Sequence, residues 1–170
     1  SAFASGWQIS SLFSAYSGLP FSVTASGTSL NAPGSTQRAD QVKPSVAILG
    51  NVGPGRSYFD PLAFAPVTAV RFGNAGYNSL RGPGLVNVDV GLFRSFRLTE
   101  RFGIQFRAEA FNFTNTPHFA NPAANVSSMQ LNSDGTIRSL GGFTSITAVT
   151  GNGREGIDER VFRIGLRVSF

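Results

Sequence analysis

The segment that decides the fold is residues 160–170, which reads R-V-F-R-I-G-L-R-V-S-F. Its even-numbered residues from Phe162 to Phe170 are all apolar, whereas three of the five odd-numbered residues from Val161 to Ser169 are polar or charged. A period of two predicts a β-strand with one apolar and one polar face. The segment also has the roughly 9–11 residues that a tilted strand needs to cross a bilayer. We therefore expect a membrane-spanning strand here.

Residues 85–98 and 102–112 show the same alternation, and a link of three residues (99–101) joins them. Both segments carry their apolar residues at even positions. Directly opposed residues of an antiparallel pair point to the same face, so opposed residue numbers must sum to an even value. A loop centred on Glu100 meets this condition. The expected pairs are Leu98 with Phe102, Phe96 with Ile104, Leu92 with Ala108, Ser95 with Gln105 and Gly91 with Glu109.

The rest of the chain gives weaker signals. Residues 6–17 are β-like with blurred alternation, 21–25 predict a short strand, and 143–150 predict another. Residues 26–84 show no ten-residue alternation, and we interpret them as a long, loop-rich insertion. Residues 112–142 form a second irregular stretch, and 151–159 a polar loop. The pattern indicates about five to seven strands.

Composition supports an all-β membrane protein. Of 170 residues, 41% are hydrophobic and only 14% are charged, whereas soluble domains contain roughly 25% charged residues. No apolar run approaches the ~18 residues of a transmembrane helix, and 20 Gly and 9 Pro favour turns. The predicted fold class is an antiparallel transmembrane β-barrel segment. Because open sheet edges cannot lie in a bilayer, we expect the chain to complete a larger barrel.

Alternation divides the strand residues into two predicted surfaces. The residues expected to face the barrel lumen are Asp89, Arg97, Gln105, Arg107, Glu109, Arg163 and Arg167. The residues expected to face lipid are Val86, Val88, Val90, Leu92, Ile104, Phe106, Phe162, Ile164, Leu166 and Val168. The lumenal charges could pair within the wall or form a ligand path, and the sequence leaves both open. Three residues do not fit the pattern. Arg94 falls among the even-numbered apolar residues, and Phe93 and Phe111 fall among the odd-numbered polar residues.

The sequence gives little support for a catalytic, metal-binding or nucleic-acid-binding site. His118 is the only histidine, cysteine is absent, and no nucleophile or phosphate-binding motif occurs. We therefore expect no enzyme activity, no cofactor and no metal. The net charge of +5 comes from arginines scattered along strands, without the clustered patch that binds nucleic acid.

Six motifs in order along the chain carry a resemblance. They are G-W-Q-I-S (6–10), S-G-L-P-F (17–21), Y-F-D-P-L-A-F (58–64), L-R-G-P-G (80–84), F-R-L-T-E-R-F (96–102) and F-R-A-E-A-F-N-F-T-N (106–115). This series resembles the C-terminal barrel segment of TonB-dependent, Oar-like outer-membrane receptors, which often carry an N-terminal carboxypeptidase-regulatory-like domain. Residues 111–115 are similar to the wider receptor family's N-L-F-D/N motif, from which Phe113 and Thr114 depart.

The resemblance implies a location and partners. All 170 residues would form the C-terminal part of a 22-stranded barrel in the bacterial outer membrane, in contact with outer-membrane lipid and closed by an N-terminal plug. The whole protein would take up a ligand with energy relayed by a TonB-type protein, through a part that precedes this chain. The terminal Phe170 would act as a signal for the outer-membrane assembly machinery.

The resemblance also implies a topology. In such barrels the C-terminus is periplasmic. Counting strands back, with 143–150 included, places the Glu100 hairpin outside and residues 26–84 in the periplasm. That side is unusual for the longest connection, because long loops are normally extracellular. A hidden strand or a segment folded into the lumen would remove the conflict. The alternative to the whole assignment is a secreted, soluble all-β binding or adhesin module.

Overall fold

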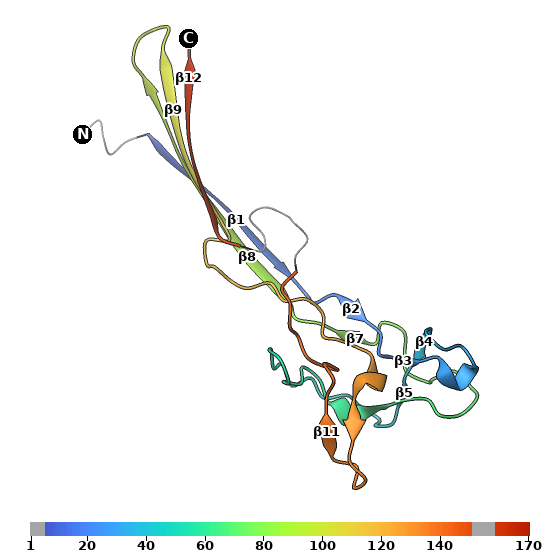
Figure 1. Cartoon of the computed structure of the whole chain (residues 1–170). Helices are drawn as coiled ribbons and strands as arrows, with labels where there is room; N and C mark the ends of the chain where they lie inside the picture. The colour runs from blue at the N-terminus through green and yellow to red at the C-terminus, as the bar shows by residue number, and fades with distance from the viewer. Residues whose placement is uncertain (1–5, 151–158) are drawn as a thin grey trace. The chain divides into compact units, whose positions relative to one another are not determined.

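The computed structural model describes residues 6–150 and 159–170, and its regular structure is antiparallel β-sheet. Four long strands form the main sheet: β1 (Trp7–Tyr16), β8 (Leu85–Arg97), β9 (Gly103–Phe111) and β12 (Val161–Ser169), in the order β1-β8-β9-β12 (Figure 1). The all-β antiparallel fold class is thereby confirmed. Within the described ranges no helix has the length and apolar character to span a membrane.

The predicted register of the β8–β9 hairpin is confirmed. Leu92 lies opposite Ala108 and Phe96 opposite Ile104. The hairpin closes through the Leu98 N–H, which donates to the Phe102 carbonyl oxygen at 2.9 Å. On the polar parity, Ser95 lies opposite Gln105 and Gly91 opposite Glu109. The three-residue loop therefore fixes which side chains share each face.

The predicted strand at residues 143–150 is wrong. Phe143 and Thr144 lie in a turn, and Thr144 has a left-handed φ of 67° that a β-branched residue rarely adopts. Phe143 and Ile146 are buried in a core of short elements. Their spacing of three residues suits such a core, whereas a strand face needs a spacing of two. Among the described residues, four strands of the main sheet have nine residues or more, the length that a tilted strand needs to span a bilayer.

The pairing of β9 with β12 fixes which chain ends lie together. Ser169 lies opposite Gly103, so the C-terminus lies beside the Glu100 hairpin (Figure 1). The long connections 17–84 and 112–160 both leave the sheet at its other end, where Tyr16 opposes Leu85 and Val161 opposes Phe111. The expectation that the hairpin and the C-terminus lie on opposite sides is wrong, because it counted 143–150 as a strand. Of the predicted polar loop, residues 151–158 lie outside the described residues.

Residues Ser17–Gly84 and Phe119–Ala148 together form a second compact unit. Its strands are short and paired: β2 (Pro20–Phe21) with β7 (Leu80–Arg81), β3 (Thr24–Ser26) with β4 (Thr36–Arg38), β5 (Asp40–Gln41) with β6 (Phe64–Ala65), and β10 (Gln130–Leu131) with β11 (Ile137–Ser139). Three short 3-10 helices, η1 (Thr28–Leu30), η2 (Pro61–Ala63) and η3 (Val126–Ser128), complete it. The segment predicted to be a loop-rich insertion thus contains ordered structure of its own.

An aromatic core holds the second unit together. The Phe59 ring is fully buried, and its centroid lies 5.8, 5.9 and 5.4 Å from those of Phe21, Phe64 and Phe143. Backbone bonds join the two segments, since the Tyr58 N–H donates to the Thr144 carbonyl oxygen at 2.9 Å. Apolar residues far apart in sequence therefore share one core, which explains why 26–84 shows no strand-like alternation.

Truncating Phe59 should destabilise this unit selectively. Phe59→Ala leaves a cavity among three rings and should cost about 3–5 kcal/mol. Phe72→Ala removes the same side chain from an exposed position in the same unit, and should cost less than about 0.5 kcal/mol. Hydrogen exchange of the Tyr58 amide reports the opening free energy. Equal losses of protection in the two variants would contradict a core centred on Phe59.

Candidate functional site

The inter-strand registers gather the seven predicted lumenal residues on one face of the main sheet. In the β8–β9 and β9–β12 ladders, each odd-numbered residue lies opposite another odd-numbered residue. Gly91 lies opposite Glu109, and Glu109 lies opposite Arg163. Asp89, Arg97, Gln105, Arg107, Glu109, Arg163 and Arg167 therefore share this polar face. Four arginines against two carboxylates leave it with an excess of two positive charges. Whether the face lines a lumen stays a prediction.

Charges on the polar face pair locally. The Arg107 Nη2 lies 2.8 Å from the Glu109 Oε1, two residues along the same strand. Both side chains are partly exposed, so the pair contributes at most about 1 kcal/mol. Arg163 lies directly opposite Glu109 on β12. The Glu109 carboxylate is thus paired within its own strand, and whether this face also forms a ligand path stays a prediction.

Asp89 ties the end of β9 to β8. Its Oδ1 accepts from the Asn87 Nδ2 at 2.8 Å and from the Asn112 backbone N–H at 2.9 Å. Asn112 is buried with a left-handed φ of 45°, and its side-chain amide bonds the Thr116 backbone at both its oxygen and its nitrogen. The Phe113 N–H donates to the Val88 carbonyl oxygen. Residues 111–115 therefore end β9, and the Asp89 carboxylate binds the backbone at that end.

The two phenylalanines on the polar face are stacked against arginines. The Arg107 Cζ lies 5.4 Å from the centroid of Phe93, and the Arg163 Cζ lies 5.1 Å from that of Phe111. A Cβ at Gly91 would approach the Phe93 ring to 2.7 Å, so glycine is needed there for the ring to lie against the sheet. Guanidinium stacking makes an aromatic ring compatible with a charged surface. Sequence reasoning did not identify these pairs, although both arginines stand on the correct parity.

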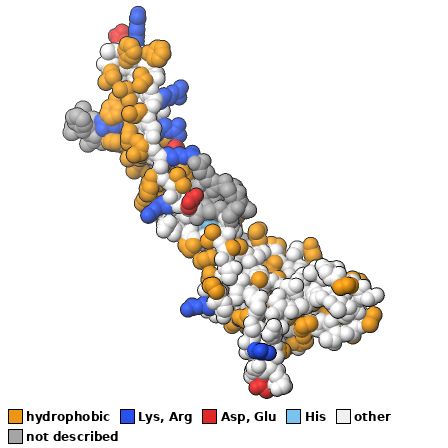
Figure 2. Space-filling view, in the orientation of Figure 1, with side chains coloured by type: hydrophobic (Ala, Val, Ile, Leu, Met, Phe, Trp, Pro, Cys, Tyr) orange, Lys and Arg blue, Asp and Glu red, His pale blue; other side chains and the backbone are white. Residues whose placement is uncertain are grey.

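The ten predicted lipid-facing residues lie together on the opposite face. Those of β12, namely Phe162, Ile164, Leu166 and Val168, have exposed fractions between 58% and 77%. Strand β1 extends the face through Ile9, which opposes Leu92, and Phe13, which opposes Val88. Figure 2 shows hydrophobic side chains along the length of the sheet. A contiguous apolar face that is exposed on β12 and partly exposed on β8 and β9 marks a surface that another apolar phase or partner covers.

His118 occupies a structural position. Its ring is buried, and its Nε2 lies 3.2 Å from the Val86 carbonyl oxygen. Among the residues that the structure describes, no group of three His, Cys, Asp or Glu side chains comes close enough to hold a metal ion. Phe170, the predicted assembly signal, is exposed beyond the last residue of β12.

Comparison with known families supplies the assignment. Residues 1–156 match the family model described as an outer membrane beta barrel domain. The chain belongs to this family. Comparisons with curated proteins and with solved structures gave no match. Family membership places this outer membrane beta barrel chain in the bacterial outer membrane.

The main sheet is an open part of such a barrel. Among the described residues, β1 and β12 are its edges and each pairs with one neighbour only. Unpaired backbone groups cannot face lipid, and bacterial outer-membrane barrels have at least about eight strands. The four long strands of this outer membrane beta barrel chain therefore require further strands at both edges.

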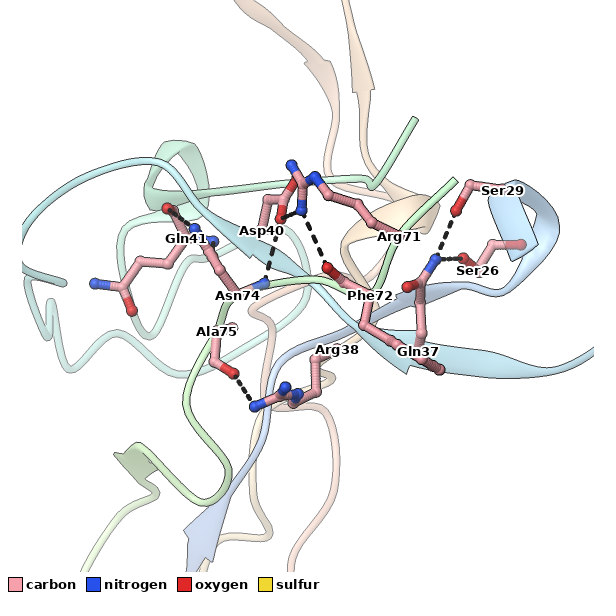
Figure 3. Close-up of polar contacts among 10 residues, drawn as sticks. All are labelled: Ser26, Ser29, Gln37, Arg38, Asp40, Gln41, Arg71, Phe72, Asn74 and Ala75. Atoms are coloured by element: carbon pink, nitrogen blue, oxygen red, sulfur yellow. Dashed lines mark hydrogen bonds and ion pairs between the residues drawn. The ribbon is translucent and has the colours of Figure 1, made fainter. Parts of the chain in front are cut away.

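The second unit of the barrel chain carries one dense polar network (Figure 3). The Arg71 guanidinium makes two 2.8 Å hydrogen bonds to the Asp40 carboxylate, and the Asn74 backbone N–H donates to the same carboxylate at 3.3 Å. The Asn74 Oδ1 accepts from the Gln41 N–H at 2.6 Å. These bonds hold residues 71–74 against β5. No sequence signal links Asp40 to Arg71, which lie 31 residues apart.

Arg71 should make the stability of the second unit pH-dependent. Hydrogen bonds from Arg71 lower the pKa of Asp40 below its ordinary value. The pair therefore stabilises the folded unit above the unfolded pKa of about 3.9, and this stability is lost as pH falls through the lower folded pKa. Asp40→Asn should flatten the loss of hydrogen-exchange protection between about pH 5 and pH 3.

Two further variants control this prediction. Arg71→Met should flatten the pH dependence as Asp40→Asn does, because it removes the partner that lowers the pKa of Asp40. Arg56→Met removes an arginine elsewhere in the unit and should keep the natural pH dependence. An unchanged slope in Arg71→Met would contradict the pairing.

Proposed function

We propose that this chain forms part of the wall of a TonB-dependent type of outer-membrane transporter that takes up an as yet unidentified ligand. The observation that carries the proposal is a sheet with one apolar and one charged face in a member of the outer membrane beta barrel family. Such a sheet fits a wall between lipid and an aqueous lumen. The ordered series of receptor-like motifs supports the TonB-dependent, Oar-like type. Family membership argues against the alternative of a secreted soluble adhesin.

The proposed sidedness follows from the sheet. The 98–102 hairpin and the C-terminus lie at one end, and both long connections leave at the other. Bacterial barrels have short periplasmic turns and longer extracellular loops. The hairpin and Phe170 are therefore periplasmic in this proposal, and residues 17–84 and 112–150 emerge at the cell surface. This arrangement removes the conflict over the side of the longest connection.

The proposal includes partners that complete the transporter. Outer-membrane lipid covers the apolar face, and further strands and an N-terminal plug supply the rest of the barrel. A TonB-type protein transmits energy through a part outside this chain, and the assembly machinery recognises the Phe170 end. The excess of arginine on the polar face suits a lumen that attracts anions. The proposal involves no catalysis, cofactor or nucleic acid.

Cysteine labelling of whole cells should report the two sides. Ser133→Cys lies in the link between β10 and β11, and Glu100→Cys lies in the β8–β9 hairpin. A membrane-impermeant maleimide should label Ser133→Cys in intact cells and Glu100→Cys only after the outer membrane is permeabilised. Detergent-solubilised samples of both variants control for reactivity. The reverse pattern would contradict the sidedness.

Energy coupling is tested on the full-length natural protein. In detergent, it should bind the purified periplasmic domain of the TonB-type protein, and heating should shift its migration on gels as expected for a barrel. Heat-modifiable migration without TonB binding would keep the barrel and overturn the TonB-dependent type. Loss of both would overturn the proposal as a whole.

A further inference from the structure

The polar face of the main sheet has a hollow near the Glu100 hairpin. Its volume is about 380 Å³, which lies at the lower end of the range for small-molecule sites. Six of its eight lining residues are odd-numbered and therefore belong to the polar face, namely Ser95, Arg97, Gly103, Gln105, Arg167 and Ser169. Among the described residues that line it, none is acidic. The hollow therefore suits a small molecule, or one group of a larger ligand, that carries negative charge.

The strand registers give the hollow its shape. Gly103 on β9 lies between Arg97 on β8 and Ser169 on β12. In the next row, Gln105 on β9 lies opposite Arg167 on β12. Gly103 carries no side chain, so the middle of its row is open. The two arginines therefore stand on the strands that flank β9, whose axes lie about 10 Å apart, with the open position between them.

The charge of these two arginines is not neutralised locally. Arg97 and Arg167 are exposed, and neither makes an ion pair or a side-chain hydrogen bond within the part of the chain that the structure describes. The nearest carboxylate along β9, that of Glu109, is paired with Arg107. The Gln105 side-chain amide also has no hydrogen-bond partner among the described residues. Two cationic groups and one amide donor are therefore available beside the open position.

We propose that this hollow binds the phosphate group of a soluble ligand, with Arg97 and Arg167 holding the phosphate oxygens and the Gln105 amide donating to them. The inference rests on the proposed function and deepens it, because it gives a chemical class to the ligand of the lumenal face. A phosphate monoester carries a charge of about −1.5 to −2 at pH 7, which matches two arginines with no carboxylate beside them. Guanidinium groups bind phosphate oxygens through paired N–H donors. A carboxylate carries a single charge and would leave one arginine uncompensated.

The test uses the full-length natural protein in a non-ionic detergent, titrated with inorganic phosphate at constant ionic strength. Binding is measured as broadening of the phosphorus NMR line of phosphate. Arg97→Gln and Arg167→Gln should each weaken binding roughly tenfold, the loss expected for charge-assisted hydrogen bonds. Arg101→Gln removes an exposed arginine from the adjacent hairpin loop, outside the lining of the hollow, and should leave binding unchanged.

Gly103→Val separates the shape of the hollow from the charge around it. Valine suits a strand, and its side chain would occupy the open position while both arginines keep their charge. A Cβ at this position would lie 2.9 Å from the Ser169 Oγ, and that hydroxyl can rotate away. Phosphate binding should fall as far as in the arginine variants. Arg97→Lys and Arg167→Lys keep the charge and should retain part of the binding, which guards against loss through misfolding.

A second titration distinguishes a soluble phosphate from a lipid headgroup. Phosphatidylglycerol in mixed micelles should not compete with inorganic phosphate, because the hollow opens on the face opposite to the apolar one. Competition by phosphatidylglycerol would assign the site to a lipid headgroup and would overturn the soluble ligand.

The remaining results separate the phosphate site from the proposed function. Natural protein that keeps heat-modifiable migration but does not broaden the phosphate line would overturn the site alone. Equal weakening by Arg101→Gln, or no weakening by Gly103→Val, would show attraction by the overall charge and would also overturn the site. Natural protein without heat-modifiable migration would overturn the proposed function, and phosphate binding that still depends on both arginines would then keep the site.

Discussion

The hydrogen-bonded register of the four long strands is the constraint on which the two-faced sheet depends. Side chains alternate with a period of two, so a shift of one residue in any ladder exchanges its faces. The β8–β9 and β9–β12 ladders pair residues of like parity, whereas the β1–β8 ladder pairs odd with even residues. Strand β1 thereby presents Trp7, Ile9 and Phe13 with the even-numbered residues of β8. One slipped ladder would place charges among the exposed apolar side chains.

Departures from alternation are accommodated by arginine–aromatic stacking. Phe93 and Phe111 lie on the polar face, and Arg107 and Arg163 stack against them. Arg94 lies on the apolar face between two aromatic rings. Such contacts contribute roughly 0.5–2 kcal/mol each. Arginine can bury its apolar stem and stack its planar guanidinium on a ring. The same contact therefore accommodates phenylalanine on the polar face and arginine on the apolar face.

The long strands and the hairpin register could be predicted because their residues alternate with a period of two. The second unit could not be predicted because its residues show no such alternation. The pairing of Phe96 with Ile104 followed from parity and loop length alone. By contrast, the core joins Phe21 and Phe59 to Phe143, and no local pattern links residues so far apart. The same is true of Asp40 and Arg71. The prediction of a strand at residues 143–150 is wrong because Phe143 and Ile146 are buried in this core, which no local pattern reveals.

Counting residues 143–150 as a strand changes the predicted side of every connection that precedes it. Each spanning strand moves the chain across the bilayer, so one strand too many exchanges the sides of every upstream connection. The pairing of β9 with β12 gives this part of the topology without a count of strands. Because β12 lies antiparallel to β9, the C-terminus and the β8–β9 hairpin share one end of the sheet. Both long connections then leave from the opposite end, which agrees with the rule that long loops are extracellular. Strand pairing shows which connections share an end of the sheet, and the loop-length rule alone assigns those ends to the two sides of the membrane in the proposed arrangement.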